Sequence, residues 1–244
     1  MTDTLPVFIG ADPREEVALD VCRFSLLRRA SIPLYVRALR LPGLRHANLY
    51  WRQSTTQGGR RIDTIDKRPF STEFAFSRFL VPALCGYEGW ALFCDCDFLF
   101  LADVAELVKR ADPAYAVMVC KQTHEPTEAS KMDDQPQSRY RRKNWSSLML
   151  FNCGHLANRK LTVHAVNTEP GSWLHGLEWL YDEEIGRLPP QWNWISGVTE
   201  GEPRAVHYTS GGPWMPKHTE VAWANEWRDE YARACAKAMG KEAA

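Results

Sequence analysis

The sequence lacks any run of about 18 uninterrupted apolar residues, the length that a transmembrane helix requires. Its N-terminus, MTDTLPVFIG, has no basic segment followed by a long apolar stretch, as a secretory signal would have. The 7 cysteines include no C-x-x-C pair, which argues against a disulfide framework and a structural zinc site. We therefore expect a cytoplasmic protein without an integral membrane segment, whose cysteines are mostly buried, reduced thiols.

The sequence also lacks an excess of charge of either sign, because 30 Lys and Arg residues balance 30 Asp and Glu residues. No overall electrostatic field therefore draws the chain to nucleic acid, and an anionic ligand needs a local site. Repeats and low-complexity tracts are absent as well. The length of 244 residues and the hydrophobic content of 45% fit one large globular domain.

Short apolar runs alternate with helical patterns in the first half of the chain, which predicts a parallel α/β sheet. The expected strands are 5–10, 34–39, 90–97, 114–120 and 146–152. The expected helices are 15–29, 73–85, 104–110 and 219–239. On the first helix, the residues expected to share the buried face are Val17, Val21, Phe24 and Leu27 or Arg28. The polar segments 45–71 and 121–145 predict a surface excursion and a binding loop or lid.

The stretch WALFCDCDFLFL places Asp95 and Asp97 in one of the most apolar segments of the chain. A buried carboxylate without a partner carries a large desolvation cost. On an extended strand both side chains lie on one face, about 6 to 7 Å apart, where a divalent cation would compensate their charges. Capping of a following turn, or pairing with arginines, is the alternative interpretation.

A second motif, AVHYTSGGPW, places His207 after an apolar pair and before a glycine-rich turn. A neutral imidazole suits a manganese-like ion that carboxylates also hold, although a packed histidine is the alternative. Gly211 and Gly212 would let backbone N–H groups approach a phosphate. The ring of the adjoining Trp214 would stack on a ligand or pack in the core.

A phosphotransferase of the haloacid dehalogenase kind also uses D-x-D after a strand. That motif normally carries a hydroxyl two residues later and lies near the N-terminus, whereas this chain has Leu99 at that position, in the middle of the sequence. A metal-dependent phosphohydrolase is therefore a disfavoured alternative.

The motifs together resemble the retaining nucleotide-sugar glycosyltransferases with the GT-A fold, most closely the family of glycogenin and the bacterial lipopolysaccharide galactosyl- and glucosyltransferases (glycosyltransferase family 8). The matching segments occur in the family's order and are FIGADPR, STEFAFSRF, ALFCDCDFLF, LMLFNCGH, WLYDEEIGRLPPQWNW and VHYTSGGPW. The resemblance implies a single α/β domain over 1–244 with a Rossmann-like, mixed and mostly parallel sheet flanked by helices. Its parts would be a nucleotide-binding half (1–100), an acceptor and metal-completing half (101–218) and a C-terminal helix (219–244).

The resemblance also implies roles for individual residues. The implied metal ligands are Asp95, Asp97 and His207. The residues implied to line the uridine, sugar and phosphate pocket are Gly10, Ala11, Asp12, Arg78, Asp95, Cys96, Gly211, Gly212, Trp214 and Lys217. The residues implied to act near the reacting sugar are Arg78, Asn152, Asp182 and Glu183. Arg78 would offset charge on the leaving diphosphate, and the carboxylates would stabilise positive charge on the sugar ring.

The chain departs from the family in three ways. Gly212 stands where the family commonly has a lysine that contacts the diphosphate, and Lys217 is a candidate substitute. Glu183 replaces the usual amide beside Asp182. The spacer between Asp97 and His207 is short for the family, which suggests trimmed acceptor elements.

These features predict a Mn²⁺- or Mg²⁺-dependent enzyme that transfers a hexose from a nucleotide sugar, UDP-glucose or UDP-galactose, to an acceptor hydroxyl with retention of configuration. The acceptor would be a glycan, a lipid-linked sugar or a protein. The missing lysine keeps a second interpretation open, a protein that binds nucleotide sugars with little or no turnover.

Overall fold

The computed structural model describes residues 4–122, 130–131, 135–136, 142 and 144–240. Its centre is a six-stranded sheet in the order β12-β8-β11-β6-β1-β2. The strands are β1 (Leu5–Gly10), β2 (Leu34–Leu39), β6 (Trp90–Cys94), β8 (Val117–Val119), β11 (Leu148–Asn152) and β12 (Ile185–Arg187). β1, β2 and β6 run parallel, β11 runs antiparallel to β6 and β8, and β12 runs parallel to β8. This mixed, mostly parallel sheet in a single domain confirms the predicted α/β class.

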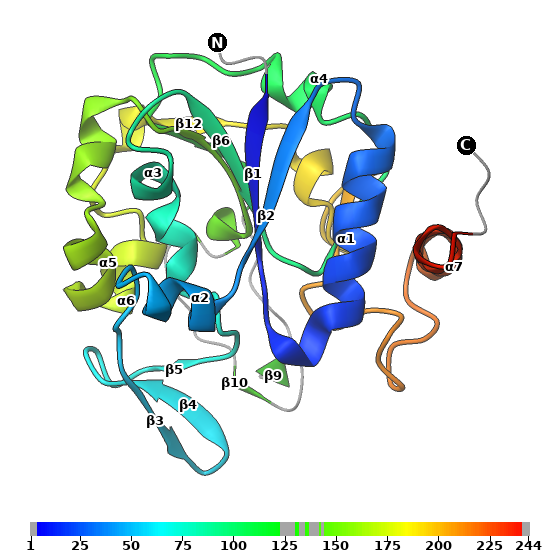
Figure 1. Ribbon diagram of the computed structural model, residues 1–244, viewed down its shortest axis with the longest axis horizontal. Helices are drawn as coiled ribbons and strands as arrows, with labels where there is room; N and C mark the ends of the chain where they lie inside the picture. The colour runs from blue at the N-terminus through cyan, green and yellow to red at the C-terminus, as the bar shows by residue number, and fades with distance from the viewer. Residues whose placement is uncertain (1–3, 123–129, 132–134, 137–141, 143, 241–244) are drawn as a thin grey trace.

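Helices lie on both sides of the sheet in Figure 1. On one side are α1 (Glu16–Arg29) and α7 (Ala224–Ala238), and on the other are α3 (Val81–Leu84), α5 (Val163–Thr168) and α6 (Gly171–His175). Two more short helices are α2 (Leu41–His46) and α4 (Ala105–Val108). The 3₁₀ helices are η1 (Pro13–Glu15), η2 (Ser77–Leu80), η4 (Trp145–Ser147), η5 (Leu156–Lys160), η6 (Asp182–Glu184) and η7 (Pro190–Asn193). No helix in these described ranges is both long and apolar enough to cross a membrane.

The central strands form the apolar core. Residues 91–94 of β6 and 148–151 of β11 are all fully inaccessible to solvent. Such continuous burial explains why both strands are uninterrupted apolar runs. All seven cysteines are free thiols and five of them are buried, which confirms the prediction of reduced, mostly buried cysteines.

The buried face of α1 differs from the predicted one. Leu19, Cys22 and Leu26 pack into the main core, whereas Val17 and Leu27 are 39% and 42% exposed. Val21 is buried as predicted, but it belongs to a second cluster that α7 covers. Because α1 packs on the main core and also contacts β7 and α7, its apolar residues do not follow a single stripe.

The predicted surface excursion contains a three-stranded antiparallel sheet of β3 (Ser54–Gln57), β4 (Arg60–Asp63) and β5 (Pro69–Phe70), which projects below the main body in Figure 1. A buried pair anchors it: Nε and Nη2 of Arg52 lie 2.8 and 2.7 Å from the carboxylate oxygens of Asp63. Arg52 also donates to the carbonyls of Val166 and Glu169, which ties the projection to α5.

Two pairs of short strands complete the fold. β7 (Phe98–Phe100) pairs antiparallel with β13 (Ala205–His207), and this register puts His207 opposite Phe98. β9 (Ser130–Lys131) pairs with β10 (Gln135–Pro136) inside the segment predicted as a binding loop or lid. Most of that segment lies outside the described residues.

Candidate metal centre and active site

Asp95 and Asp97 lie just beyond the carboxyl end of β6, in the turn that leads to β7. The expectation that both lie on one face of an extended strand is therefore wrong, because the strand ends at Cys94. Hydrogen bonds of 3.0 Å hold the turn on both sides, from the N–H of Asp95 to the carbonyl of Ser147 and from the N–H of Tyr208 to the carbonyl of Asp97. The turn is thus fixed between β11 and the chain after β13.

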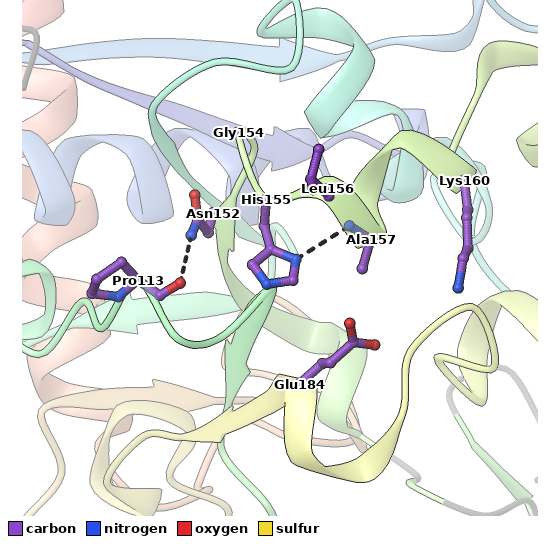
Figure 2. Close-up of a pocket in the computed structure, with 8 residues that line it drawn as sticks. All are labelled: Pro113, Asn152, Gly154, His155, Leu156, Ala157, Lys160 and Glu184. Atoms are coloured by element: carbon purple, nitrogen blue, oxygen red, sulfur yellow. Dashed lines mark hydrogen bonds between the residues drawn. The ribbon is translucent and has the colours of Figure 1, made fainter.

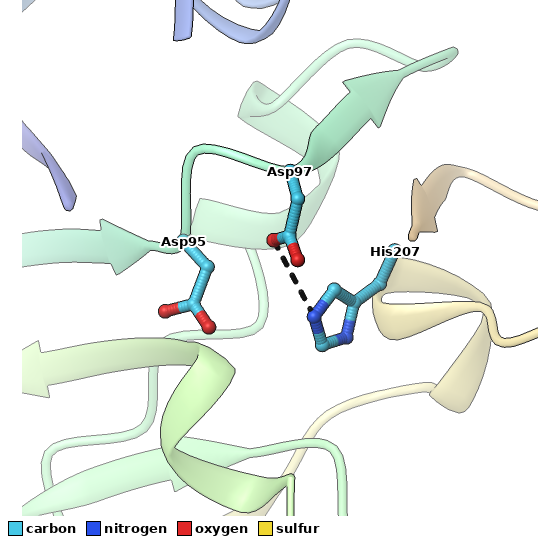
Figure 3. A group of neighbouring side chains, drawn as sticks. All are labelled: Asp95, Asp97 and His207. Atoms are coloured by element: carbon cyan, nitrogen blue, oxygen red, sulfur yellow. Dashed lines mark ion pairs between the residues drawn. The ribbon is translucent and has the colours of Figure 1, made fainter. Parts of the chain in front are cut away.

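The side chains of Asp95, Asp97 and His207 converge on one point, as Figure 3 shows. One carboxylate oxygen from each aspartate and one ring nitrogen of His207 all lie within 4.8 Å of one another. Nε2 of His207 is 3.5 Å from Oδ1 of Asp97. Two carboxylates and an imidazole form a donor set that suits Mn²⁺ or a similar divalent ion. These three residues, the candidate metal-binding group, therefore fit a divalent metal.

Arg78 compensates the charge of Asp95. Its Nη1 lies 2.8 Å from Oδ1 of Asp95 and donates to the carbonyl of Ser146 at 2.8 Å. The guanidinium also lies over the rings of Phe74 and Phe93, 5.2 and 5.1 Å from their centroids, and Arg78 is only 5% exposed. These contacts fix the guanidinium of Arg78 beside the metal-binding group, where its positive charge was predicted.

Glu15 is a buried acid beside this group that the sequence analysis did not identify. It ends η1, is 1% exposed, and accepts a hydrogen bond of 3.7 Å from the thiol of Cys96. Burial, followed by the nearby charges of Asp97 and Asp12, raises the pKa of Glu15 to about 8. At neutral pH Glu15 is therefore a neutral carboxylic acid, and it adds no third negative charge to the group.

This raised pKa gives a testable pH dependence. Between about pH 4.5 and about pH 8 the folded, metal-free protein keeps the proton of Glu15 while the unfolded chain has lost it, so stability falls as pH rises through this window. We expect the unfolding free energy of the wild-type protein to fall by on the order of 3 kcal/mol between pH 5 and 8 because of Glu15, and Glu15→Gln to remove this fall. In urea unfolding, the midpoint of the variant should therefore change less with pH than the wild-type midpoint. Glu226→Gln, a change on the exposed side of α7, should reproduce the wild-type decline; an equal decline in Glu15→Gln would contradict the assignment.

The segment 10–12, predicted to line the uridine pocket, lies at the same edge of the sheet as the metal-binding group, because Ile9 of β1 pairs with Cys94 of β6. A Cβ atom on Gly10 would lie 2.4 Å from the ring of Phe74. Gly10 is therefore required for packing, independently of any nucleotide.

The side chain of Asp12 is committed to holding this loop. It is fully buried and accepts hydrogen bonds from Nε and Nη2 of Arg14, at 3.0 and 2.9 Å, and from the N–H of Glu73 at 3.0 Å. Burial opposes its ionisation, but these hydrogen bonds outweigh burial and lower the pKa of Asp12. Asp12 is thus an ionised anchor between β1 and the segment before η2.

In the glycine turn after β13, neighbouring aromatic rings occupy the space where side chains at positions 211 and 212 would lie. Gly211 has a φ of 119°, and a Cβ there would lie 2.6 Å from the ring of His218. A Cβ on Gly212 would lie 1.9 Å from the ring of Trp214. A lysine at position 212 would therefore displace Trp214. Lys217, the candidate substitute for that lysine, is exposed to solvent and lies five residues further along the chain.

Two other predicted cofactor-binding residues are used in packing. Cys96 is fully buried, with its thiol on Glu15. The ring of Trp214 packs against Tyr208 and Trp227, with centroid distances of 5.8 and 5.5 Å. These contacts connect the glycine turn to α7.

Asn152, and the start of β12 that follows Asp182 and Glu183, lie toward the other end of the central strands from Cys94, and the expected place of these residues beside the reacting sugar stays a prediction. Asn152 pairs with Trp90 at the start of β6, about 13 Å along the strands from Cys94. β12 begins opposite Val117 at this same end, so the acids just before it lie there too. The side chain of Asp182 is 66% exposed and pairs with Arg142.

A pocket of about 760 Å³ at this far end is lined by Asn152, His155, Lys160 and Glu184, as Figure 2 shows. Its polar groups bond within the chain: Nδ1 of His155 accepts from the N–H of Ala157, and Asn152 donates to the carbonyl of Pro113. The pocket is separate from the metal-binding group, because Asn152 lies beside Trp90 at the opposite end of β6 from Cys94 and none of the three possible metal ligands lines it.

Comparison with solved structures identifies the fold. The chain is similar to the glycosyltransferase GlyE of Streptococcus pneumoniae TIGR4 (16% identity, TM-score 0.58, 98% of this chain and 64% of that chain) and to the bifunctional glycosyltransferase WbbM (15%, 0.60, 99% and 52%). It is also similar to the galactosyltransferase LgtC in complex with donor and acceptor sugar analogs (13%, 0.54, 94% and 96%). The chain thus has the GT-A glycosyltransferase fold, and it spans slightly under two thirds of GlyE and about half of WbbM.

Sequence comparison gives the family. No protein-family model matches the chain. It is 45% identical over 231 residues to the protein CDI of Arabidopsis thaliana, an alignment that covers 92% of this chain and 85% of the relative. At that identity and coverage, the chain belongs to the same protein family as CDI.

Proposed function

We propose that this protein is a divalent-metal-dependent glycosyltransferase of the family 8 type that transfers a hexose, from UDP-glucose or UDP-galactose, to an acceptor hydroxyl with retention of configuration. The observation that carries the proposal is the convergence of Asp95, Asp97 and His207 within 4.8 Å at the strand ends of a GT-A sheet. Ligands bind at this end of open α/β sheets. The complex of LgtC with donor and acceptor sugar analogs supports the same class of substrates for this fold.

The proposed roles follow from charge and position. Residues 1–100 would hold the nucleotide and residues 101–218 would complete the metal site and shape the acceptor pocket. Asp95, Asp97 and His207 would hold the metal, which when bound stabilises negative charge on the diphosphate. Arg78, already fixed at Asp95, would add a second positive charge beside that leaving group.

The test is a screen of nucleotide sugars with and without Mn²⁺, scored by release of nucleoside diphosphate. We expect release with a UDP-hexose and Mn²⁺, and loss of release after chelation that added Mn²⁺ or Mg²⁺ restores. No release from any nucleotide sugar would contradict the proposal. Phosphate release from simple phosphate esters would instead indicate a phosphohydrolase.

A second candidate function is binding of a nucleotide sugar without turnover. The observations that favour it are the absence of a lysine at position 212, where a Cβ would meet the ring of Trp214, and the pairing of Asn152 with Trp90 at the start of β6, away from Cys94. Calorimetric binding of UDP with Mn²⁺, together with no hydrolysis or transfer of any donor, would establish this second function.

A further inference from the structure

Asn193 is a fully buried polar residue in contact with His207. It ends η7 and is 0% exposed. Its Oδ1 lies 2.8 Å from Nδ1 of His207, and its Nδ2 donates to the carbonyl of Asn144 at 3.1 Å. Its own carbonyl accepts from the side-chain amide of Gln122. Asn193 is thus held on three sides, by the residue before η4, by the chain after β8 and by β13.

These hydrogen bonds determine the orientation of the Asn193 amide. Nδ2 can only donate, and the carbonyl of Asn144 is its acceptor, so Oδ1 is the atom that faces His207. Oδ1 can only accept, so the hydrogen in this bond lies on Nδ1 of the imidazole. The lone pair of a neutral His207 ring therefore lies on Nε2, the nitrogen 3.5 Å from Asp97.

The position of the imidazole ring is fixed as well as its tautomer. The ring stacks on Phe98 with a centroid distance of 4.5 Å and an interplanar angle of 9°. The N–H of His207 donates to the carbonyl of Trp194 at 2.8 Å, and the N–H of Trp194 donates to the carbonyl of Ala205 at 3.0 Å. The residue after Asn193 is therefore attached to the same strand that carries His207.

We propose that Asn193 is a positioning residue for metal binding: it holds His207 in the Nδ1–H tautomer and presents Nε2 to the ion between Asp95 and Asp97. This inference rests on the proposed metal-dependent function. Histidines that bind metals generally donate their second ring N–H to a fixed acceptor, and loss of that acceptor lowers metal affinity about 10- to 100-fold.

Two measurements test the proposal. In metal-free, ¹⁵N-labelled protein with a neutral His207 ring, long-range ¹H–¹⁵N spectra should show Nδ1 protonated and Nε2 bare, with the signals assigned by comparison with His207→Gln. Asn193→Ala should shift the ring toward the Nε2–H tautomer. In calorimetric titrations with Mn²⁺ alone, the same variant should bind about 10- to 100-fold more weakly than wild type.

A matched control and a rescue variant separate positioning from stability. Asn158 is also 0% exposed, and its side chain donates to the carbonyls of Ala116 and Asn152 and accepts from the indole N–H of Trp179, but it lies at the far end of the sheet. Asn158→Ala should therefore lose stability without changing the tautomer or the Mn²⁺ affinity. Asn193→Asp keeps an acceptor for the Nδ1–H of His207. It should keep the Nδ1–H tautomer and bind Mn²⁺ within a few-fold of the wild-type affinity.

The outcomes are distinct. An Nε2–H tautomer in the wild-type protein would overturn the proposal even if every variant failed to fold. An unchanged tautomer or an unchanged Mn²⁺ affinity in Asn193→Ala would overturn it as well. A wild-type protein that has the Nδ1–H tautomer but binds no Mn²⁺ would contradict the proposed metal dependence and leave the hydrogen-bonding role of Asn193 supported.

Discussion

Replacement of Asp97 by asparagine is expected to reduce the rate of Mn²⁺-dependent release of nucleoside diphosphate by about 10³-fold or more. A bound metal supplies several kcal/mol of charge stabilisation at a leaving diphosphate, and each 1.4 kcal/mol or so is a factor of ten in rate. The substitution keeps the size of the side chain but removes the negative charge that lies within 4.8 Å of the other two donor atoms. Steady-state kinetics with a UDP-hexose over a range of Mn²⁺ concentrations measures the effect.

The control for this prediction is Asp229→Asn, since Asp229 lies on the exposed side of α7. We expect that variant to keep the wild-type rate. Thermal unfolding of both variants without metal shows whether the fold is intact. A folded Asp97→Asn protein with the wild-type rate would remove the basis for a catalytic metal at this turn.

Replacement of Arg52 by methionine is expected to cost about 3 to 5 kcal/mol of unfolding free energy, because it leaves Asp63 buried without its charge partner. Both side chains are 1% exposed, and two hydrogen bonds join them. The variant also leaves the carbonyls of Val166 and Glu169 without the Arg52 donor. For a chain of this length the loss corresponds to a fall in Tm of about 6 to 20 °C, measurable by calorimetry.

Arg40→Met is the matched comparison for this prediction. Arg40 pairs with Glu16 in the same way, but the two side chains are 49% and 41% exposed, so the expected loss is within about 1 kcal/mol. The double variant Arg52→Met, Asp63→Leu should recover part of the stability, since a buried ion pair can be replaced by apolar groups at little cost. Equal losses for Arg52→Met and Arg40→Met would contradict the argument from burial.

Most of the metal-binding group could be predicted from the sequence, because carboxylates and imidazoles are recognisable as possible metal ligands from residue type alone. Two acids directly after an apolar run, and a histidine before a glycine turn, stand out without knowledge of the fold. Arg78 followed from the family resemblance. The central sheet was predictable because β1, β2 and β6 are apolar runs separated by a helix or a long excursion.

The location of Asn152 was not predictable in the same way, because the direction of its strand is not encoded in its hydrophobic pattern. The segment LMLFN reads equally well in either direction. In the structure β11 runs antiparallel to β6. Its first residues, after Ser147, therefore lie at the same end of the sheet as the metal-binding group, and its last residue, Asn152, lies at the opposite end. The same reasoning applies to Asp182 and Glu183, whose location depends on the register of β12.

Glu15 and Asn193 were missed for a different reason. An acid at the start of a helix and an asparagine in a proline-rich turn are common, and their importance here depends on neighbours far away in the sequence. Glu15 gains its raised pKa from burial and from the nearby charges of Asp97 and Asp12. Asn193 gains its role from the ring of His207.

The ladder between β7 and β13 has a consequence for how this site tolerates change. The distance between Asp97 and His207 is set by a three-residue antiparallel pairing, in which His207 faces Phe98, and not by the length of the chain between them. Loops inserted or shortened in that intervening region would leave Asp97 and His207 together as long as this pairing is kept, so the proposed acceptor pocket can diversify there without loss of the proposed metal site. A one-residue slip in the ladder, by contrast, would bring Val206 or Tyr208 to the histidine's place.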